Sequence, residues 1–163
     1  MNAPIIRLIQ KADNPHIARI IRSVLEDFNV PKVGTAYADA ALDCMFETYQ
    51  SPRAAYFVLE ENGSIIGGGG IAQLANYEGN VCELQKMYFL PEARGRGLGT
   101  KMIDTCLREA QKFGFEQCYL ETMDYMHEAQ KLYRKYGFQY LEGPMGDTGH
   151  HACGVNMILT LQP

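Results

Sequence analysis

The segment Arg94-Gly95-Arg96-Gly97-Leu98-Gly99-Thr100 constrains the fold most, because it joins a predicted strand to the clearest predicted helix of the chain. The strand covers residues 81–90. Residues 98–113 place apolar side chains at helical spacing, and Gly114 suits the left-handed residue that ends many helices. Glycines before a helix leave backbone N–H groups open, and the helix start adds partial positive charge. We therefore expect an α/β fold that binds an oxyanion, such as a diphosphate, at this turn.

The other elements follow from the period of the apolar residues and from the turn residues between them. Asp13-Asn14-Pro15 offers a cap and a proline at the start of a helix, and Asn62-Gly63 suits the positive φ angles of a tight hairpin. The order β-α-α-β-β-β-α-β-α-β-β predicts an α/β layered fold with a mixed, largely antiparallel sheet flanked by helices. Helices are predicted over residues 15–28, 38–49, 98–113 and 127–136, and strands over 4–9, 56–61, 64–74, 81–90, 117–122, 138–142 and 153–161.

Four consecutive glycines, residues 67–70, lie inside one predicted strand. Glycine weakens a strand locally because it has no side chain to pack. The run therefore predicts a bulge, or a place where another group approaches the backbone closely.

Composition excludes several classes of protein. The 163 residues predict one domain over 1–163, and 15 basic against 19 acidic side chains argue against an electrostatically driven nucleic-acid binder. No stretch approaches the roughly 20 apolar residues of a membrane span, and the N-terminus lacks the pattern of an export signal. The 5 cysteines share no C-x-x-C spacing and mostly sit in apolar runs, which is typical of reduced core thiols in a cytoplasmic protein.

Two motifs carry a family resemblance. The run L-P-E-A-R-G-R-G-L-G-T covers residues 90–100, and A-Q-K-L-Y-R-K-Y-G-F covers residues 129–138. Together they resemble the GNAT superfamily of acetyl-CoA-dependent N-acetyltransferases, whose signature is [RQ]-x-x-G-x-[GA]. Arg94, Gly97 and Gly99 occupy the signature positions. The predicted order of elements also matches the GNAT fold from the first strand to the last.

The resemblance implies acetyl-CoA as cosubstrate and no metal. In the family, the glycine-rich turn holds the pyrophosphate, and the preceding strand pairs its backbone with the pantetheine arm where two parallel strands splay apart. This chain departs from the pattern at Met126, where many members have an asparagine that bonds the pantetheine amide. The cofactor-binding residues implied here are Met87, Tyr88, Phe89, Arg94, Gly95, Arg96, Gly97, Leu98, Gly99 and Thr100.

Acetyl transfer requires a neutral amine to attack the thioester, and deprotonating an alkylammonium of pKa about 10 at pH 7 costs roughly 4 kcal/mol. Glu83 is the candidate base, because it lies on the strand leading into the turn and resembles the catalytic glutamate of several family members. The alternative is a solvated carboxylate paired with Lys86 or another cation. Tyr133 is the candidate acid, because it matches the tyrosine that in many members points at the thioester sulfur. The alternative is a ring that only packs on the sheet.

Two loops are expected to shape the acceptor pocket, over residues 29–36 and 143–151. His150 in the second loop is an alternative base. Three other charged residues have no informative spacing and are interpreted as structural: Arg53, Glu121 and Asp124.

A metal site is the other interpretation of the second loop. Adjacent histidines point in different directions in an extended chain, and no carboxylate beyond Asp147 completes a ligand set. We therefore expect no metal at the side chains that invite this interpretation, which are Thr148, His150, His151 and Cys153.

These observations predict an N-acetyltransferase that moves an acetyl group from acetyl-CoA to a primary amine of a small molecule, amino acid or peptide. The alternative is a non-catalytic regulatory module that binds acyl-CoA, and O-acyl or succinyl transfer would change the acceptor or the donor. The presence of both Glu83 and Tyr133 favours the enzyme, because a module that only binds acyl-CoA needs neither a base nor an acid. No nucleic acid or membrane partner is expected. The family often forms dimers, so a homodimer is one possibility, and the sequence leaves the oligomeric state open.

Overall fold

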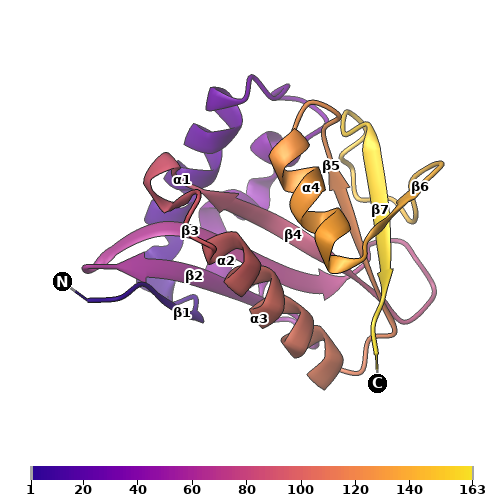
Figure 1. The fold of residues 1–163 in the computed structure, drawn as a ribbon, viewed down its shortest axis with the longest axis horizontal. Coiled ribbons are helices and arrows are strands. Elements are labelled where there is room, and N and C mark those ends of the chain that lie inside the picture. The colour runs from indigo at the N-terminus through magenta and orange to yellow at the C-terminus, as the bar shows by residue number, and fades with distance from the viewer. Residues whose placement is uncertain (1, 163) are drawn as a thin grey trace.

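A seven-stranded mixed sheet runs through the molecule, in a computed structural model that describes residues 2–162 (Figure 1). The strands lie in the order β1-β2-β3-β4-β5-β7-β6, and every neighbouring pair is antiparallel except β4 and β5. The predicted fold class and order of elements are confirmed. The strands are β1 (Ile5–Leu8), β2 (Ala55–Glu61), β3 (Ser64–Gln73), β4 (Val81–Phe89), β5 (Gln117–Thr122), β6 (Gln139–Leu141) and β7 (Val155–Thr160).

Helices cover both faces of the sheet. In Figure 1, α3 and α4 lie in front of the sheet, and α1 lies behind it with α2 packed against it. Ile17, Ile21 and Leu25 form the buried stripe of α1, because residues three to four apart share one face of a helix. The helices are α1 (Asn14–Asp27), α2 (Met45–Thr48), α3 (Leu98–Lys112) and α4 (His127–Tyr136).

The predicted turn residues have the backbone angles expected of them. Asn62 and Gly63 join β2 to β3 with φ values of 51° and 79°. Gly114 and Gly137 follow α3 and α4 with φ values of 83° and 102°. These short-range signals are reliable because each depends only on the local backbone.

The helix predicted over residues 38–49 is wrong over most of its length. The segment instead forms two 3₁₀ turns, Ala36–Ala38 and Ala40–Cys44, before the single turn of α2. Asp39 between them is extended, with φ −65° and ψ 123°, and its carboxylate is held by cations from two other elements. Long-range contacts therefore override the helical spacing of this segment.

The start of α1 also differs from prediction. Pro15 lies in the first turn as expected, but the side chain of Asp13 makes no capping hydrogen bond. Its Oδ2 instead accepts hydrogen bonds from Arg7 Nη1 at 2.9 Å and from the backbone N–H of Gln10 at 2.7 Å. Asp13 thereby ties β1 to the 3₁₀ turn Lys11–Asp13 that leads into the helix.

Two features of β4 shape the site. It pairs with β5 only from Val81 to Glu83, and the two strands separate beyond that point. Its register against β3 shifts between Gly68 and Gly70, opposite Lys86, whose φ is +48°. This bulge reverses which face of the sheet each following side chain takes.

The glycines of β3 permit a close approach by a tyrosine of β2. A Cβ added at Gly68 would lie 2.6 Å from Tyr56 Oη, and one at Gly70 would lie 2.6 Å from the carbonyl oxygen of Ala55. The hydroxyl of Tyr56 donates to the carbonyl of Lys86 at 2.7 Å. The predicted close approach is confirmed here, whereas the extra residue of the bulge lies in β4 opposite the glycines, where Tyr56 stabilises it.

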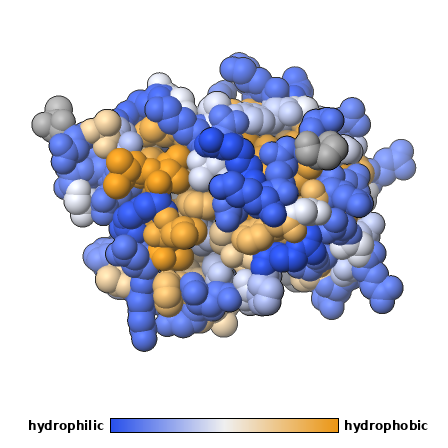
Figure 2. Space-filling model, turned by 90° about the horizontal axis from the view of Figure 1, so that it is seen from below, coloured by the Kyte–Doolittle hydropathy of each residue, from blue (hydrophilic) through white to orange (hydrophobic). Residues whose placement is uncertain are grey.

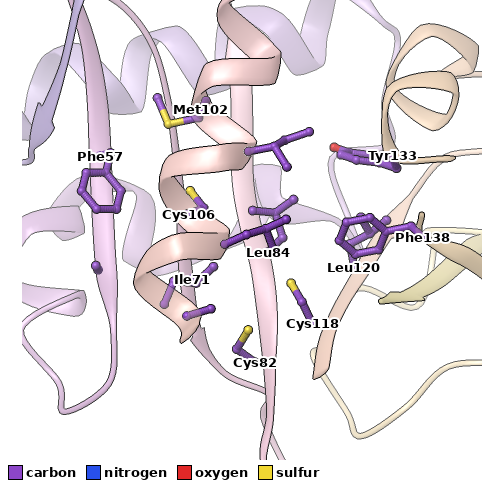
Figure 3. Packing of buried hydrophobic residues seen from close by; sticks show 14 of the residues in the cluster. Phe57, Ile71, Cys82, Leu84, Met102, Cys106, Cys118, Leu120, Tyr133 and Phe138 are labelled. Carbon is purple, nitrogen blue, oxygen red and sulfur yellow. The ribbon is translucent and has the colours of Figure 1, made fainter. Parts of the chain in front are cut away.

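Separate hydrophobic clusters fill the two sides of the sheet. One faces α3 and α4, and the other faces α1 and α2. Cys82, Cys106 and Cys118 are buried in the first cluster as free thiols, as Figure 3 shows. They act as small core residues, as the sequence predicts.

The surface is largely hydrophilic with separate apolar patches, as Figure 2 shows from below. Ile5 and Leu8, two of the exposed large apolar residues, belong to the edge strand β1. Within residues 2–162, no helix is both long enough and apolar enough to cross a bilayer.

Candidate active site

A cavity of about 740 Å³ lies where β4 and β5 separate. Its walls come from α1, β4, β5, α4, the turn before α3 and the two loops that carry Thr35 and His150. Glu83, Gly97 and Tyr133 all line it. The cavity therefore brings the predicted anion-binding turn, base and acid to one space.

The turn between β4 and α3 fits a phosphate group. Gly95 and Gly97 have φ values of 71° and 76°, and a Cβ added at either would meet no atom within 4 Å. Gly97 is the N-cap of α3, so the first N–H groups of the helix follow it without partners inside the helix. Open space, positive φ and unpaired amides together form the backbone arrangement that binds oxyanions.

The two arginines of this turn contact protein groups. Arg94 donates from Nε and Nη2 to the carbonyl of Phe89 at 3.1 and 2.9 Å, and its guanidinium lies 5.2 Å from the centre of the Phe28 ring. Arg96 pairs with Glu61 of β2 and is not part of the cavity wall. Arg94 thus supports the end of β4 beside the cavity, and a phosphate contact by either arginine stays a prediction.

The last residues of β4 line the cavity on both sides of the strand. After the bulge, Tyr88 packs with the cluster that faces α1, whereas Met87 and Phe89 pack with the cluster that faces α3. The β5 side of this segment has no strand partner within residues 2–162. Its backbone N–H and C=O groups can therefore pair with an extended ligand, as an added strand would.

Glu83 is buried at the point where the parallel strands separate, with 5% of its surface exposed. Its Oε1 accepts a hydrogen bond from Gln85 Nε2 at 2.8 Å, and Gln85 in turn accepts one from the hydroxyl of Tyr49. Burial raises the pKa of Glu83 to about 7, with a further increase from the charge of Glu121. The alternative of a solvated carboxylate paired with Lys86 is wrong.

Glu121 and His150 lie beside Glu83. The three side chains each place one oxygen or nitrogen within 4.8 Å of the others, and His150 Nδ1 is 3.8 Å from Glu121 Oε1. Glu121 accepts hydrogen bonds from the hydroxyls of Tyr119 and Thr148. The interpretation of Glu121 as a structural surface charge is therefore wrong, because β5 turns it into the cavity.

Asp39 holds two cations at the same place. Its Oδ2 lies 2.8 Å from His150 Nε2 and 3.3 Å from Lys86 Nζ. Burial lowers the pKa of His150, but the hydrogen bond to Asp39 and its charge outweigh burial, so the pKa is raised overall. The loop after α1 is thus joined to the loop before β7 across the cavity.

Tyr133 reaches the cavity from α4. Its ring packs on Phe138 with centres 5.9 Å apart, and Figure 3 shows its hydroxyl pointing away from Phe138 toward β4. Within residues 2–162, every fully buried polar side-chain atom has a hydrogen-bond partner, whereas the hydroxyl of Tyr133 has none. The oxygen is therefore open to the cavity. Burial raises the pKa of Tyr133, so the phenol stays protonated at neutral pH.

Comparison with known proteins places this arrangement in a family. The profile of the "Acetyltransferase (GNAT) family" matches residues 18–138, which include β4, the glycine-rich turn and α4. The chain belongs to the GNAT family. The resemblance read from the two sequence motifs is confirmed, and so is the expectation of an acyltransferase enzyme.

Relatives of this GNAT chain include a protein that matches nearly all of it. It is 42% identical over 160 residues to the uncharacterized N-acetyltransferase YjgM of Escherichia coli K12, covering 98% of this chain and 96% of that protein. A GNAT-family acetyltransferase of Staphylococcus aureus Mu50 has the same fold, with a TM-score of 0.86 at 20% identity over 98% of this chain and 100% of that one. YncA of Salmonella typhimurium, solved with its cofactor acetyl-CoA, gives 0.76 at 23% identity over 99% and 95% of the two chains.

Sequence reasoning missed three residues of this GNAT site: Asp39, Lys86 and Glu121. The alternation of β5 could have indicated Glu121, because it shares a strand face with Tyr119, which lies opposite Glu83. Asp39 carries no comparable signal, because its partner His150 is 111 residues away in the sequence.

The side chains of Glu83, Glu121 and His150 are also of types that bind divalent metal ions. Cys153 lines the cavity, whereas the ring of His151 packs against Gly34 outside this group. The predicted absence of a metal therefore stays a prediction, and chelation can test it. Met126 and His127 both line the cavity, so the departure from the family's asparagine leaves a thioether on that wall.

Proposed function

We propose that this protein transfers an acetyl group from acetyl-CoA to a primary amine by direct attack of the amine nitrogen on the thioester. The main support is a single cavity whose wall includes the turn before α3, the free edge of β4, Glu83 and Tyr133. The family to which the chain belongs supports the same reaction class.

The chain's own groups fit the parts of acetyl-CoA, which supplies an acyl group already activated as a thioester. The amides of residues 95–100 would bind the pyrophosphate, since two glycines with positive φ leave them open. The free edge of β4 at Met87, Tyr88 and Phe89 would pair with the amides of the pantetheine arm. The thioester would then lie in the gap between β4 and β5.

Glu83 would take the proton of the acceptor. A base is most effective when its pKa is close to the working pH, and burial brings the pKa of Glu83 to about 7. At that pKa, a large fraction of Glu83 is ionised at neutral pH. The nitrogen lone pair then forms the new C–N bond while the C–S bond breaks.

Tyr133 would supply a proton to the departing sulfur. Its hydroxyl has no other partner within residues 2–162 and is open to the cavity. A CoA thiol has a pKa near 8.5, so protonation by a nearby phenol favours its departure.

Acetyl-CoA mixed with a panel of primary amines tests the proposal, with free thiol measured over time and the acetylated amine confirmed by mass. Thiol release that depends on an amine supports it. Binding of acetyl-CoA without thiol release from any amine would favour the non-catalytic module. Turnover only with alcohols, or only with succinyl-CoA, would replace the proposed acceptor or donor.

A further inference from the structure

The part of the cavity around Glu83 carries more negative than positive charge. Three carboxylates, those of Asp39, Glu83 and Glu121, meet two cationic side chains, those of Lys86 and His150. Asp39 contacts both cations through one oxygen, at 3.3 Å from Lys86 and 2.8 Å from His150. When Glu83 is ionised, as its role as the base requires, one negative charge in this cluster has no partner even if His150 is protonated.

Within residues 2–162, Glu83 forms no ion pair, and Glu121 has only a distant one, with a histidine. The side chain of Glu121 is 6% exposed, and the nearest basic nitrogen within residues 2–162 is His150 Nδ1 at 3.8 Å. The hydroxyls of Tyr119 and Thr148 donate to its two oxygens, and they orient the carboxylate without neutralising it. A buried charge is costly unless a counter-charge accompanies it, so the site is suited to a ligand that brings a cation.

Part of the cavity wall is apolar. Val30, Ala36 and Met123 line the cavity and belong to the hydrophobic cluster that faces α1. These side chains offer contact area to an alkyl or aryl group and no partner to a second charge.

We propose that the acceptor is a primary monoamine with an apolar body and no carboxylate, bound as its ammonium beside Glu121. This inference rests on the proposed function and names its substrate class. One ammonium neutralises the charge left over in the cluster. The carboxylate of an amino acid would restore that charge, and it would find Lys86 and His150 already held by Asp39.

Matched pairs of acceptors that differ only in a carboxylate test the inference. We would measure kcat/KM at one pH for 2-phenylethylamine against phenylalanine, and for 3-methylbutylamine against leucine. The expected preference for the monoamine is at least about tenfold in each pair. The less basic α-amine of the amino acid has the larger neutral fraction, so amine basicity cannot produce this preference.

Two variants test whether Glu121 causes the preference for monoamines. Glu121→Gln keeps the size and one acceptor oxygen, and we expect it to raise KM for the monoamines about tenfold. The ratio of kcat/KM between monoamine and amino acid, in which any change in Glu83 as the base cancels, should fall by a similar factor. Asp124→Asn removes an exposed carboxylate three residues away that is not part of the cavity wall, and we expect no change. Melting curves of both variants check that they fold.

Each outcome decides between the claims. Equal or better turnover of the amino acids would overturn the inference and leave the proposed function intact. An unchanged KM in folded Glu121→Gln would also overturn it. If acetyl-CoA binds and neither member of a pair releases thiol, while the wider amine panel does, the apolar monoamine class is wrong. If no amine in the panel releases thiol from acetyl-CoA, the proposed function itself is overturned.

Discussion

Glu83 and Tyr133 lie on opposite faces of the sheet and line the same cavity. Cys82 and Leu84, the neighbours of Glu83 in β4, belong to the cluster under α3 together with Tyr133, so Glu83 points toward α1. The two side chains meet one space only because β4 and β5 stop pairing after Glu83. This gap lets a base and an acid approach one group from two sides, and it underlies the predictions below.

Binding of CoA should depend on the backbone of Gly97. At a CoA concentration about 100 times Kd, linkage gives about 2.7 kcal/mol of stabilisation, which raises the melting temperature of a protein of this size by roughly 5–10 °C. Gly97→Glu should abolish this shift, because its carboxylate would enter the anion-binding turn. Gly114→Glu is the matched control, since Gly114 has a φ of +83° and equally open surroundings at the far end of α3. Equal CoA shifts in the two variants would contradict the assigned turn.

Loss of the Tyr133 hydroxyl should slow turnover without weakening the fold. Tyr133→Phe keeps the ring contact with Phe138 and removes the proton donor. General acid assistance is typically worth about 10²–10⁴-fold, so kcat should fall within that range while Kd for acetyl-CoA stays unchanged. Tyr140→Phe, in the exposed strand β6, serves as the control in the same steady-state assay. A change in kcat below about twofold would mean that Tyr133 is only a packing residue.

The pH dependence of turnover should report the ionisation of Glu83. In the wild type, kcat/KM should rise with pH up to about 7, where Glu83 ionises, and then stay level up to the pKa of the amine. Glu83→Gln cannot take the proton, so its rate should follow the neutral fraction of the amine, which grows about tenfold per pH unit. The loss caused by the substitution should therefore shrink from pH 7 upward. A uniform loss from pH 6 to 9 would indicate substrate positioning, and no loss would move the base role to His150 or solvent.

The same substitution should stabilise the protein at alkaline pH. A carboxyl whose pKa rises from 4.5 unfolded to about 7 folded binds more protons in the folded state, so its contribution to stability falls as pH rises from about 4.5 to 7. Glu83→Gln removes this loss and should raise the free energy of unfolding at pH 8 by up to about 3 kcal/mol. At pH 4.5 the two proteins should differ little. Denaturant titrations at both pH values measure this, and a lower stability of the variant at pH 8 would refute it.

Removal of metal ions should leave turnover unchanged. A divalent cation bound to Glu83 would lower the pKa of its carboxyl and make it a weaker base for the proton of the amine. We expect dialysis against a chelator to leave kcat/KM within about twofold of the untreated protein. A loss that zinc or another divalent ion restores would assign a metal to Glu83, Glu121 and His150.

The sequence by itself determined the parts of this protein that depend on short stretches of chain. The stripe of α3, the hairpin at Asn62-Gly63 and the open turn at Gly97 each follow from local backbone preferences or from the period of apolar residues. Glu83 and Tyr133 could be named because they stand at fixed distances from two motifs. The GNAT fold was predictable for the same reason.

Only the tertiary structure decided how the acceptor end is built. Lys86 takes a positive φ that its residue type does not favour, and Tyr56 of β2, two strands away in the sheet, holds its carbonyl there. Asp39 leaves a helical pattern to bind His150, 111 residues further along the chain. Such contacts depend on which distant segments the sheet brings side by side. That placement cannot be predicted from residue type or from spacing within one segment.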